Sequence, residues 1–191
     1  MNALKLLRDD HRTAEGLFKK FEQAGGRAHK TKRGIVDKII QELSVHAAIE
    51  EQVLYPAARA AVPDAEHDVL EALEEHHVVK WTLSELDGMD PTDQRFDAKV
   101  TVLIESVRHH VDEEERELFP KLQKAMDKKD LDELGEALEK AKQVAPTRPH
   151  PRSPDTPPAN IVVGAAAGAL DRALGVGKEV AEKAARTVRR K

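Results

Sequence analysis

The chain has 191 residues, of which 35% are charged and only 3% are aromatic, and its formal net charge is −4. It contains no cysteine, which excludes disulfides, iron–sulfur clusters, zinc ribbons and thiol catalysis, so any metal must be held by nitrogen and oxygen atoms. Residues 148–191 carry nine Lys or Arg against four Asp or Glu, which leaves a net charge of −9 on residues 1–147. This acidic balance argues against nucleic-acid binding by the larger part of the chain.

The N-terminus lacks the apolar core and the small-residue cleavage site of a signal peptide. No apolar run approaches the roughly 20 residues that a bilayer-spanning helix needs. We therefore expect a cytoplasmic protein. The chain is long enough for one domain with a sizeable core and a tail, and its composition favours helices over strands.

Apolar side chains recur at helical spacing in four long segments that are separated by helix breakers. The helices are expected at about residues 3–24, 31–60, 65–86 and 93–125, followed by a short helix at about 131–141. Pro56 and Pro120 interrupt the second and fourth segments. Each proline should kink or end its helix, because it lacks a backbone donor and clashes with the preceding turn. The predicted fold class is all-α.

The C-terminal part of the chain differs in composition from the helical part. Six of the thirteen residues from 146 to 158 are proline, so residues 144–160 are predicted to form an extended linker. Residues 161–191 form a basic tail, which we interpret as a disordered or partly helical surface segment. The alternative is an amphipathic helix that binds a membrane surface or a partner.

The second and fourth helices contain matching segments. One is His46-Ala-Ala-Ile-Glu50-Glu-Gln-Val-Leu-Tyr-Pro56, and the other is His110-Val-Asp-Glu-Glu114-Glu-Arg-Glu-Leu-Phe-Pro120. In both, His precedes Glu by four residues, which places the two side chains one turn apart on one helix face. Because that face continues the apolar stripe, both His and both Glu should point into the core.

A buried ionised carboxylate without a partner costs several kcal/mol, so Glu50 and Glu114 require a cation, and their stripes contain no Lys or Arg. The first and third helices each place one more His on the apolar stripe. A single core His is usually structural, but two matched motifs with two further histidines indicate a metal site. Imidazole and carboxylate donors suit iron, manganese, zinc or copper, and six of them suit a pair of ions. The predicted ligands are His11, His46, Glu50, His76, His110 and Glu114.

The neighbouring polar residues receive less specific predictions. Glu51 and Glu115 are expected to turn outward, as surface acids or as acceptors behind the ligands. Tyr55 is expected to pack in the core, with a ligand or redox role as the alternative. His77 and His109 fall off the stripe and are predicted to be solvated or to lie behind the ligands, whereas His29, His67 and His150 are predicted to be surface or linker residues.

These motifs resemble the hemerythrin-like family, also called the HHE cation-binding domain. The resemblance spans about residues 4–125 and rests on Asp-His11-Arg, Glu-Glu-His76 and the two repeated segments. It implies an up-down-up-down four-helix bundle, here residues 1–143, around a non-haem di-iron centre. In that centre Glu50 and Glu114 and an oxo or hydroxo group would bridge the two irons.

The chain departs from the oxygen-carrying members of this family, which have His-x-x-x-His on the third helix and a final Asp at a longer spacing. Here Lys80 follows His76 by four residues, and the last carboxylate is Glu114. Six ligands instead of seven leave one position open, which favours reaction over storage. Lys80 is expected to be a surface residue, with a hydrogen bond to a bound peroxide as the alternative.

The expected function is therefore to react with or sense a small oxidant: hydrogen peroxide, nitric oxide or dioxygen. A catalase-like or peroxidase-like activity, or consumption of nitric oxide, is the enzymatic version of this hypothesis. The alternative is reversible dioxygen binding, or iron storage and donation without turnover. A third hypothesis is a regulatory module whose metal state controls the tail.

Overall fold

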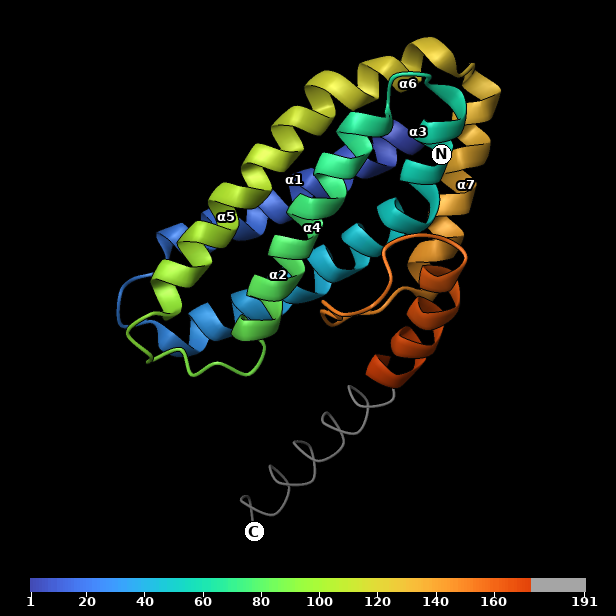
Figure 1. Ribbon diagram of the computed structural model, residues 1–191. Coiled ribbons are helices and arrows are strands. Elements are labelled where there is room, and N and C mark those ends of the chain that lie inside the picture. Colours follow the sequence, from blue (N-terminus) through green and yellow to red (C-terminus); the bar gives the residue numbers. More distant parts are fainter. Residues whose placement is uncertain (173–191) are drawn as a thin grey trace.

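The computed structural model describes residues 1–172 of the chain (Figure 1). Within this range every regular element is helical and none is a strand. Four long helices form the bundle: α1 (Ala3–Gln23), α2 (His29–Ile49), α4 (Glu66–Leu86) and α5 (Phe96–Glu113). The predicted all-α four-helix bundle is confirmed.

The two repeated segments change their hydrogen-bond pattern just before their prolines. α2 continues into the π-helical turn η1 (Glu50–Leu54) and then α3 (Tyr55–Ala61), and α5 continues into η2 (Glu114–Leu118) and α6 (Phe119–Ala125). In both turns an N–H donates to the carbonyl five residues earlier, from Tyr55 to Glu50 and from Phe119 to Glu114. The proline is then the second residue of a new α-helix, where its missing N–H is tolerated.

Two clusters of buried apolar side chains fill the bundle and leave a polar layer between them. One cluster joins the N-terminal half of α1 to α3, α6 and α7 and includes Leu4, Leu7, Leu54, Tyr55 and Phe119. The other joins the opposite ends of the long helices and includes Phe18, Ile39, Leu83, Phe96 and Leu103. Burial of these side chains stabilises the bundle at both ends of the polar layer.

Helix α7 (Lys128–Val144) is longer than the short helix expected at 131–141. It begins with a capping box, in which the side-chain carboxylates of Asp127 and Asp130 each accept a hydrogen bond from the backbone N–H of the other residue. Its apolar face buries Leu131, Leu134 and Leu138, and it packs against α1, α2 and η1. α7 therefore covers the part of the bundle that contains one π turn.

The chain after α7 folds back onto the bundle, and we call residues 145–172 the C-terminal strap (Figure 1). Its first part is irregular but contacts α4, where Arg148 pairs with Asp87 at 2.7 Å and Asp155 lies 3.1 Å from His77. Its second part, residues 159–172, is helical. The segment predicted as an extended linker is thus packed on the bundle. The rest of the predicted tail, residues 173–191, lies outside the described residues.

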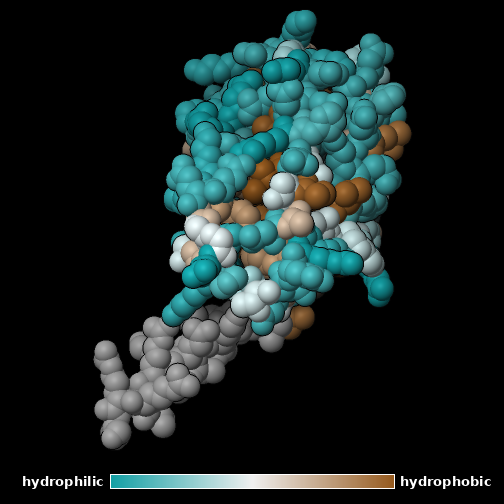
Figure 2. Space-filling view, turned by 90° about the vertical axis from the view of Figure 1, so that its left-hand side faces the viewer, coloured by the Kyte–Doolittle hydropathy of each residue, from teal (hydrophilic) through white to brown (hydrophobic). Residues whose placement is uncertain are grey.

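The surface in Figure 2 is mostly hydrophilic, and the largest group of hydrophobic residues lies near the middle of that face. Among the described residues, no helix combines the length and the apolar character that crossing a membrane requires. The charged residues of the sequence therefore lie mainly where the helices face water, as the apolar periodicity predicts.

The strap helix approaches α7 so closely that a side chain at Gly168 has no room. A Cβ atom built there would lie 2.2 Å from the carbonyl oxygen of Val144. We predict that Gly168→Leu displaces the strap and increases cleavage within residues 146–158 at least several-fold in limited proteolysis. Ala166→Leu, at an exposed position of the same helix, is the control and should leave the cleavage rate unchanged. Equal rates for the two variants would contradict this packing.

Candidate metal centre

The six side chains predicted as ligands meet in the polar layer between the two apolar clusters, and all are buried: His11, His46, Glu50, His76, His110 and Glu114. The imidazoles form two facing pairs. The Nε2 atoms of His11 and His46 are 3.1 Å apart, and those of His76 and His110 are 3.2 Å apart. Two pairs of nitrogens that converge in this way define two neighbouring positions for a cation.

Glu50 lies between the two pairs. Its Oε1 atom is 3.2 Å from Nε2 of His46, and its Oε2 atom is 3.4 Å from Nε2 of His76. Glu114 is closest to the first pair, with Oε2 at 3.4 Å from Nε2 of His11. The donor atoms fall into two groups, each within 4.8 Å: one has His11, His46, Glu50 and Glu114, and the other has Glu50, His76 and His110.

The chemistry of these atoms fits a metal pair. Both oxygens of Glu50 and both oxygens of Glu114 are buried without a hydrogen-bond partner. Buried carboxylate oxygens are normally satisfied, because leaving them unpaired costs several kcal/mol. A cation in each group would satisfy them, and Glu50 is placed to contact both cations.

Behind each imidazole lies a carboxylate from another helix: Glu115 behind His11, Asp10 behind His46, Glu51 behind His76 and Glu75 behind His110. The Nδ1–oxygen distance is 2.7 Å at His11 and His110, 3.0 Å at His76 and 4.0 Å at His46. Where Nδ1 donates to a carboxylate, Nε2 is left as the unprotonated nitrogen that faces inward. The carboxylates thereby orient the imidazoles for metal binding.

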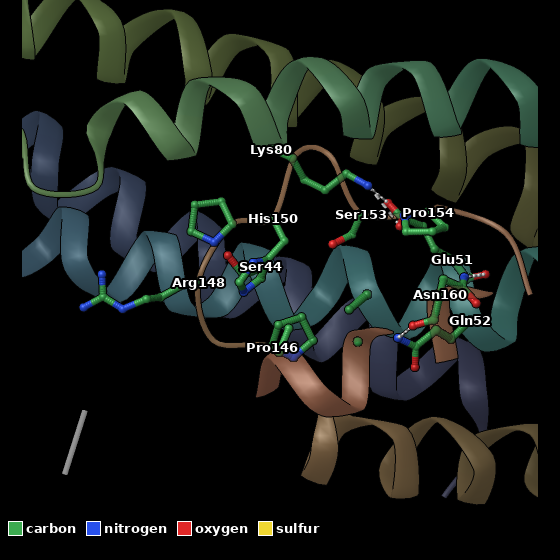
Figure 3. Close-up of a pocket in the computed structure, with 14 residues that line it drawn as sticks. Ser44, Glu51, Gln52, Lys80, Pro146, Arg148, His150, Ser153, Pro154 and Asn160 are labelled. Atoms are coloured by element: carbon green, nitrogen blue, oxygen red, sulfur yellow. Dashed lines mark hydrogen bonds and ion pairs between the residues drawn. The ribbon is translucent and has the colours of Figure 1, made fainter. Parts of the chain in front are cut away.

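The expectation that Glu51 turns outward is wrong, but its alternative role as an acceptor behind a ligand, here His76, is confirmed. Glu51 is 6% exposed, and its carboxylate also accepts from the Lys80 ammonium at 2.8 and 3.0 Å (Figure 3). The π turn explains the difference, because its wider turn lets two consecutive side chains, Glu50 and Glu51, face the bundle interior. The surface role expected for Lys80 is also wrong, since this side chain is buried in an ion pair.

Four further polar side chains lie next to the histidines. Glu115 is the acceptor behind His11, although its side chain is still 33% exposed. Tyr55 packs in the core as expected, but its hydroxyl also lies 3.2 Å from Nε2 of His76. Sequence reasoning missed Asp10 and Glu75, each directly before a predicted ligand, because each contacts the histidine of a different helix.

The pKa values of the two central carboxyl groups, Glu50 and Glu114, shift in opposite directions. Burial and the nearby Glu114 carboxylate raise the pKa of Glu50 well above its usual value. Burial acts in the same direction on Glu114, but the His11 and His110 imidazoles outweigh it and lower the pKa of that carboxyl. Burial lowers the pKa of His46 to about 4. Without a cation, burial therefore favours the protonated form of Glu50 and the neutral form of His46, and a metal ion would compete with the proton for Glu50.

The C-terminal strap supports the first π turn (Figure 3). Pro56 lacks the N–H that would continue the π pattern to the Glu51 carbonyl, and Nδ2 of Asn160 donates to this carbonyl at 3.1 Å instead. The backbone carbonyl of Asn160 in turn accepts from Nε2 of Gln52 at 3.3 Å. The strap therefore satisfies a buried group next to the carboxylate that orients His76.

This geometry agrees with comparisons to known proteins. Residues 2–122 match the hemerythrin HHE cation-binding domain, and the chain belongs to this family. The chain is 27% identical over 164 residues to a hemerythrin-like protein of Schizosaccharomyces pombe, with 85% of this chain and 80% of that protein covered. A crystal structure of an HHE cation-binding domain-containing protein from Mycobacterium kansasii superposes with a TM-score of 0.64 and 26% identity, over 75% of this chain and 86% of that one.

A DNA nickase of Nostoc sp. is 30% identical over 119 residues, which is 62% of this chain but only 33% of the nickase. The shared part lies within a much longer protein, so the likeness concerns one region of the nickase. The family defines this chain as a protein with a cation-binding helical domain.

We predict that Glu50→Gln stabilises the metal-free protein. The raised pKa means that folded Glu50 holds its proton above the unfolded value of 4.5, so its contribution to stability is lost as the pH rises through the folded pKa. Gln stays neutral, so the variant's advantage in free energy of unfolding should grow above pH 4.5 by at most about 1.4 kcal/mol per pH unit.

The measurement is urea unfolding of metal-free protein from pH 4.5 to 8, with and without added metal. Glu50→Gln should also lose the increase in melting temperature that the metal causes in the wild type. Glu105→Gln removes an exposed carboxylate of α5 and is the control. A pH profile of Glu50→Gln that parallels the wild type would show that Glu50 does not titrate as proposed.

Proposed function

We propose that this chain is a non-haem di-iron protein that binds a small oxidant, such as hydrogen peroxide, nitric oxide or dioxygen, and reacts with it or senses it. The observation that carries the proposal is a donor set of six side chains beside a small apolar cavity. Four imidazoles and two carboxylates suit redox-active first-row metals, iron among them. When bound, a pair of irons would supply the redox change and an open coordination position.

The open position follows from the residue after the third histidine. Lys80 stands one turn beyond His76, where a further His would complete the donor set of an oxygen carrier. Its Nζ atom is held by both carboxylate oxygens of Glu51, at 2.8 and 3.0 Å, and this ion pair keeps it from acting as a metal ligand. A cation in the group of Glu50, His76 and His110 therefore has only three side-chain donors.

A small cavity lined by all four long helices reaches the four histidines. Half of its twelve lining residues are the histidines with Asp10 and Glu42, and the other half are small or aliphatic: Ala14, Leu43, Ala47, Val79, Val107 and Val111. Its volume is about 20 Å³, and one water molecule needs about 10–15 Å³ on this measure. The cavity admits a diatomic molecule or a peroxide, whereas an organic substrate would not fit.

The hydroxyl group of Tyr55 lies close to this centre. Burial and the Glu50 carboxyl raise the pKa of Tyr55 well above 10, so the phenol keeps its proton at neutral pH. Its oxygen is 3.2 Å from Nε2 of His76. It is therefore placed to donate a hydrogen bond to a ligand bound beside His76.

The direct test loads the protein with iron and mixes it with hydrogen peroxide while oxygen release is followed. We expect turnover well above that of the same concentration of free iron. Nitric oxide consumption is measured in parallel, and optical spectra are recorded after reduction and exposure to air. A stable oxygenated spectrum that lasts minutes without turnover would overturn the reactive function in favour of reversible dioxygen binding. No response to any of the three ligands would overturn the proposal as a whole.

A cavity-filling variant tests whether the oxidant enters by the proposed route. Ala47→Leu adds three carbon atoms to the cavity wall, so we expect oxidant consumption to fall about tenfold or more while the iron content stays at two per chain. Ala60→Leu, at an exposed site on α3, is the matched control. Iron analysis of each preparation separates blocked access from lost metal. Unchanged consumption by Ala47→Leu at full iron content would exclude this cavity as the entrance.

A further inference from the structure

A second opening reaches the centre between α4 and α5, and carboxylates line it. Its volume is about 110 Å³, enough for several water molecules. Six of the nine lining residues are acidic: Asp68, Glu71, Glu75, Glu113, Glu114 and Glu117. None of the lining residues is Lys or Arg, although Lys121 pairs with Asp68 at one edge. We call this opening the acidic pocket.

The acidic pocket leads to the predicted metal ligands. Glu114 and His110 form part of its wall, and Glu114 is 4% exposed with both carboxylate oxygens unpartnered. An unpartnered buried carboxylate at the inner end of a negatively charged opening attracts a cation from solvent toward the centre. Only two of the twelve residues that line the apolar cavity are acidic, Asp10 and Glu42, so the acidic pocket carries the greater negative charge.

A separate group of metal-binding side chains stands beside the pocket on the outer side of His110. Glu75, His109 and Glu113 place one donor atom each within 4.8 Å of one another. Nε2 of His109 lies 3.3 Å from Oε1 of Glu113 and 3.9 Å from Oε1 of Glu75. The other oxygen of Glu75 accepts from Nδ1 of His110 at 2.7 Å. One carboxylate thus belongs both to the outer group and to the support of an inner ligand.

The outer group has its own His-x-x-x-Glu motif in the sequence, formed by His109 and Glu113, neither of which is a predicted ligand of the inner centre. His109 and Glu113 repeat the His-x-x-x-Glu spacing of His110 and Glu114, shifted by one residue and therefore turned outward by about 100°. At the matching positions of the first repeat stand Val45 and Ile49, which are buried. The repeat alone therefore does not explain why His and Glu occupy positions 109 and 113.

We propose that Glu75, His109 and Glu113 form an outer site for a divalent first-row cation, through which the acidic pocket loads the inner centre. Two carboxylates and one imidazole suit Fe²⁺ or Mn²⁺, and three donors on a half-exposed surface hold such an ion weakly enough to release it. From this site the ion reaches Glu114 and His110 through the acidic pocket. The inference rests on the proposed metal centre but not on its reaction with oxidants.

Anaerobic Mn²⁺ binding to the metal-free full-length protein tests the outer site, with free Mn²⁺ followed by electron paramagnetic resonance. We expect two tightly bound ions and one weakly bound ion per chain. The variant His109→Gln/Glu113→Gln should lose the weak ion, keep the two tight ions and load them at least tenfold more slowly at low salt. Glu136→Gln removes the same charge from an exposed position on α7 and should behave as the wild type. Glu75 is left unchanged because it supports His110.

The outcomes separate this inference from the proposed function. Loading at the wild-type rate by the double variant, or the absence of a weak third ion in the wild type, would overturn the outer site. Slow loading that persists at 1 M salt would also count against a charged entry route, because salt screens it. If the two tight ions are absent while one weak ion is lost in the variant, the inner metal centre fails and the outer site stands.

Discussion

The burial of two carboxyl groups beside each other dominates the interior of this protein. Glu50 and Glu114 are 0% and 4% exposed, and neither has a hydrogen-bond partner for its carboxylate oxygens. Such a pair is costly in most domains, because the free energy of desolvation exceeds the favourable interaction with neighbouring groups. Here four imidazoles, each with a carboxylate behind it, surround the pair. The bundle is thus built to accept positive charge at its centre, at the expense of the stability of the metal-free protein.

The sequence predicts the fold and the inner side chains because both follow from helical spacing. The apolar stripes of the long helices identify the residues that face the core, and His11, His46, His76 and His110 interrupt those stripes. The structure places them, with Glu50 and Glu114, in one layer. What these residues hold in the protein stays a prediction, since the geometry defines donor groups and not the identity of the ion.

The errors come from two features that helical spacing cannot express. A regular α-helix would turn Glu51 outward, and the π turn at Glu50–Leu54 changes that rotation. Lys80 lies on α4, one turn after His76 and on the same face, and it is buried there because it pairs with Glu51 across the two helices. Asp10 and Glu75 were missed because each contacts a histidine on a neighbouring helix, a relation fixed by helix packing and absent from any local pattern. The proline in each repeat is the sequence feature that accompanies the π turn. It predicts a kink or a helix end, whereas in the structure it is the second residue of the α-helix that follows the π turn.

The position of Asn160 has a consequence for the boundary of the domain. The match to the family's domain ends at residue 122, yet a side chain 38 positions later completes the hydrogen bonding of the first π turn. A fragment trimmed to residues 2–122 would contain every candidate ligand and would still lack the group that replaces the missing donor of Pro56. In this protein, the segment that contains the candidate ligands is therefore shorter than the segment that supports their positions, which extends to Asn160.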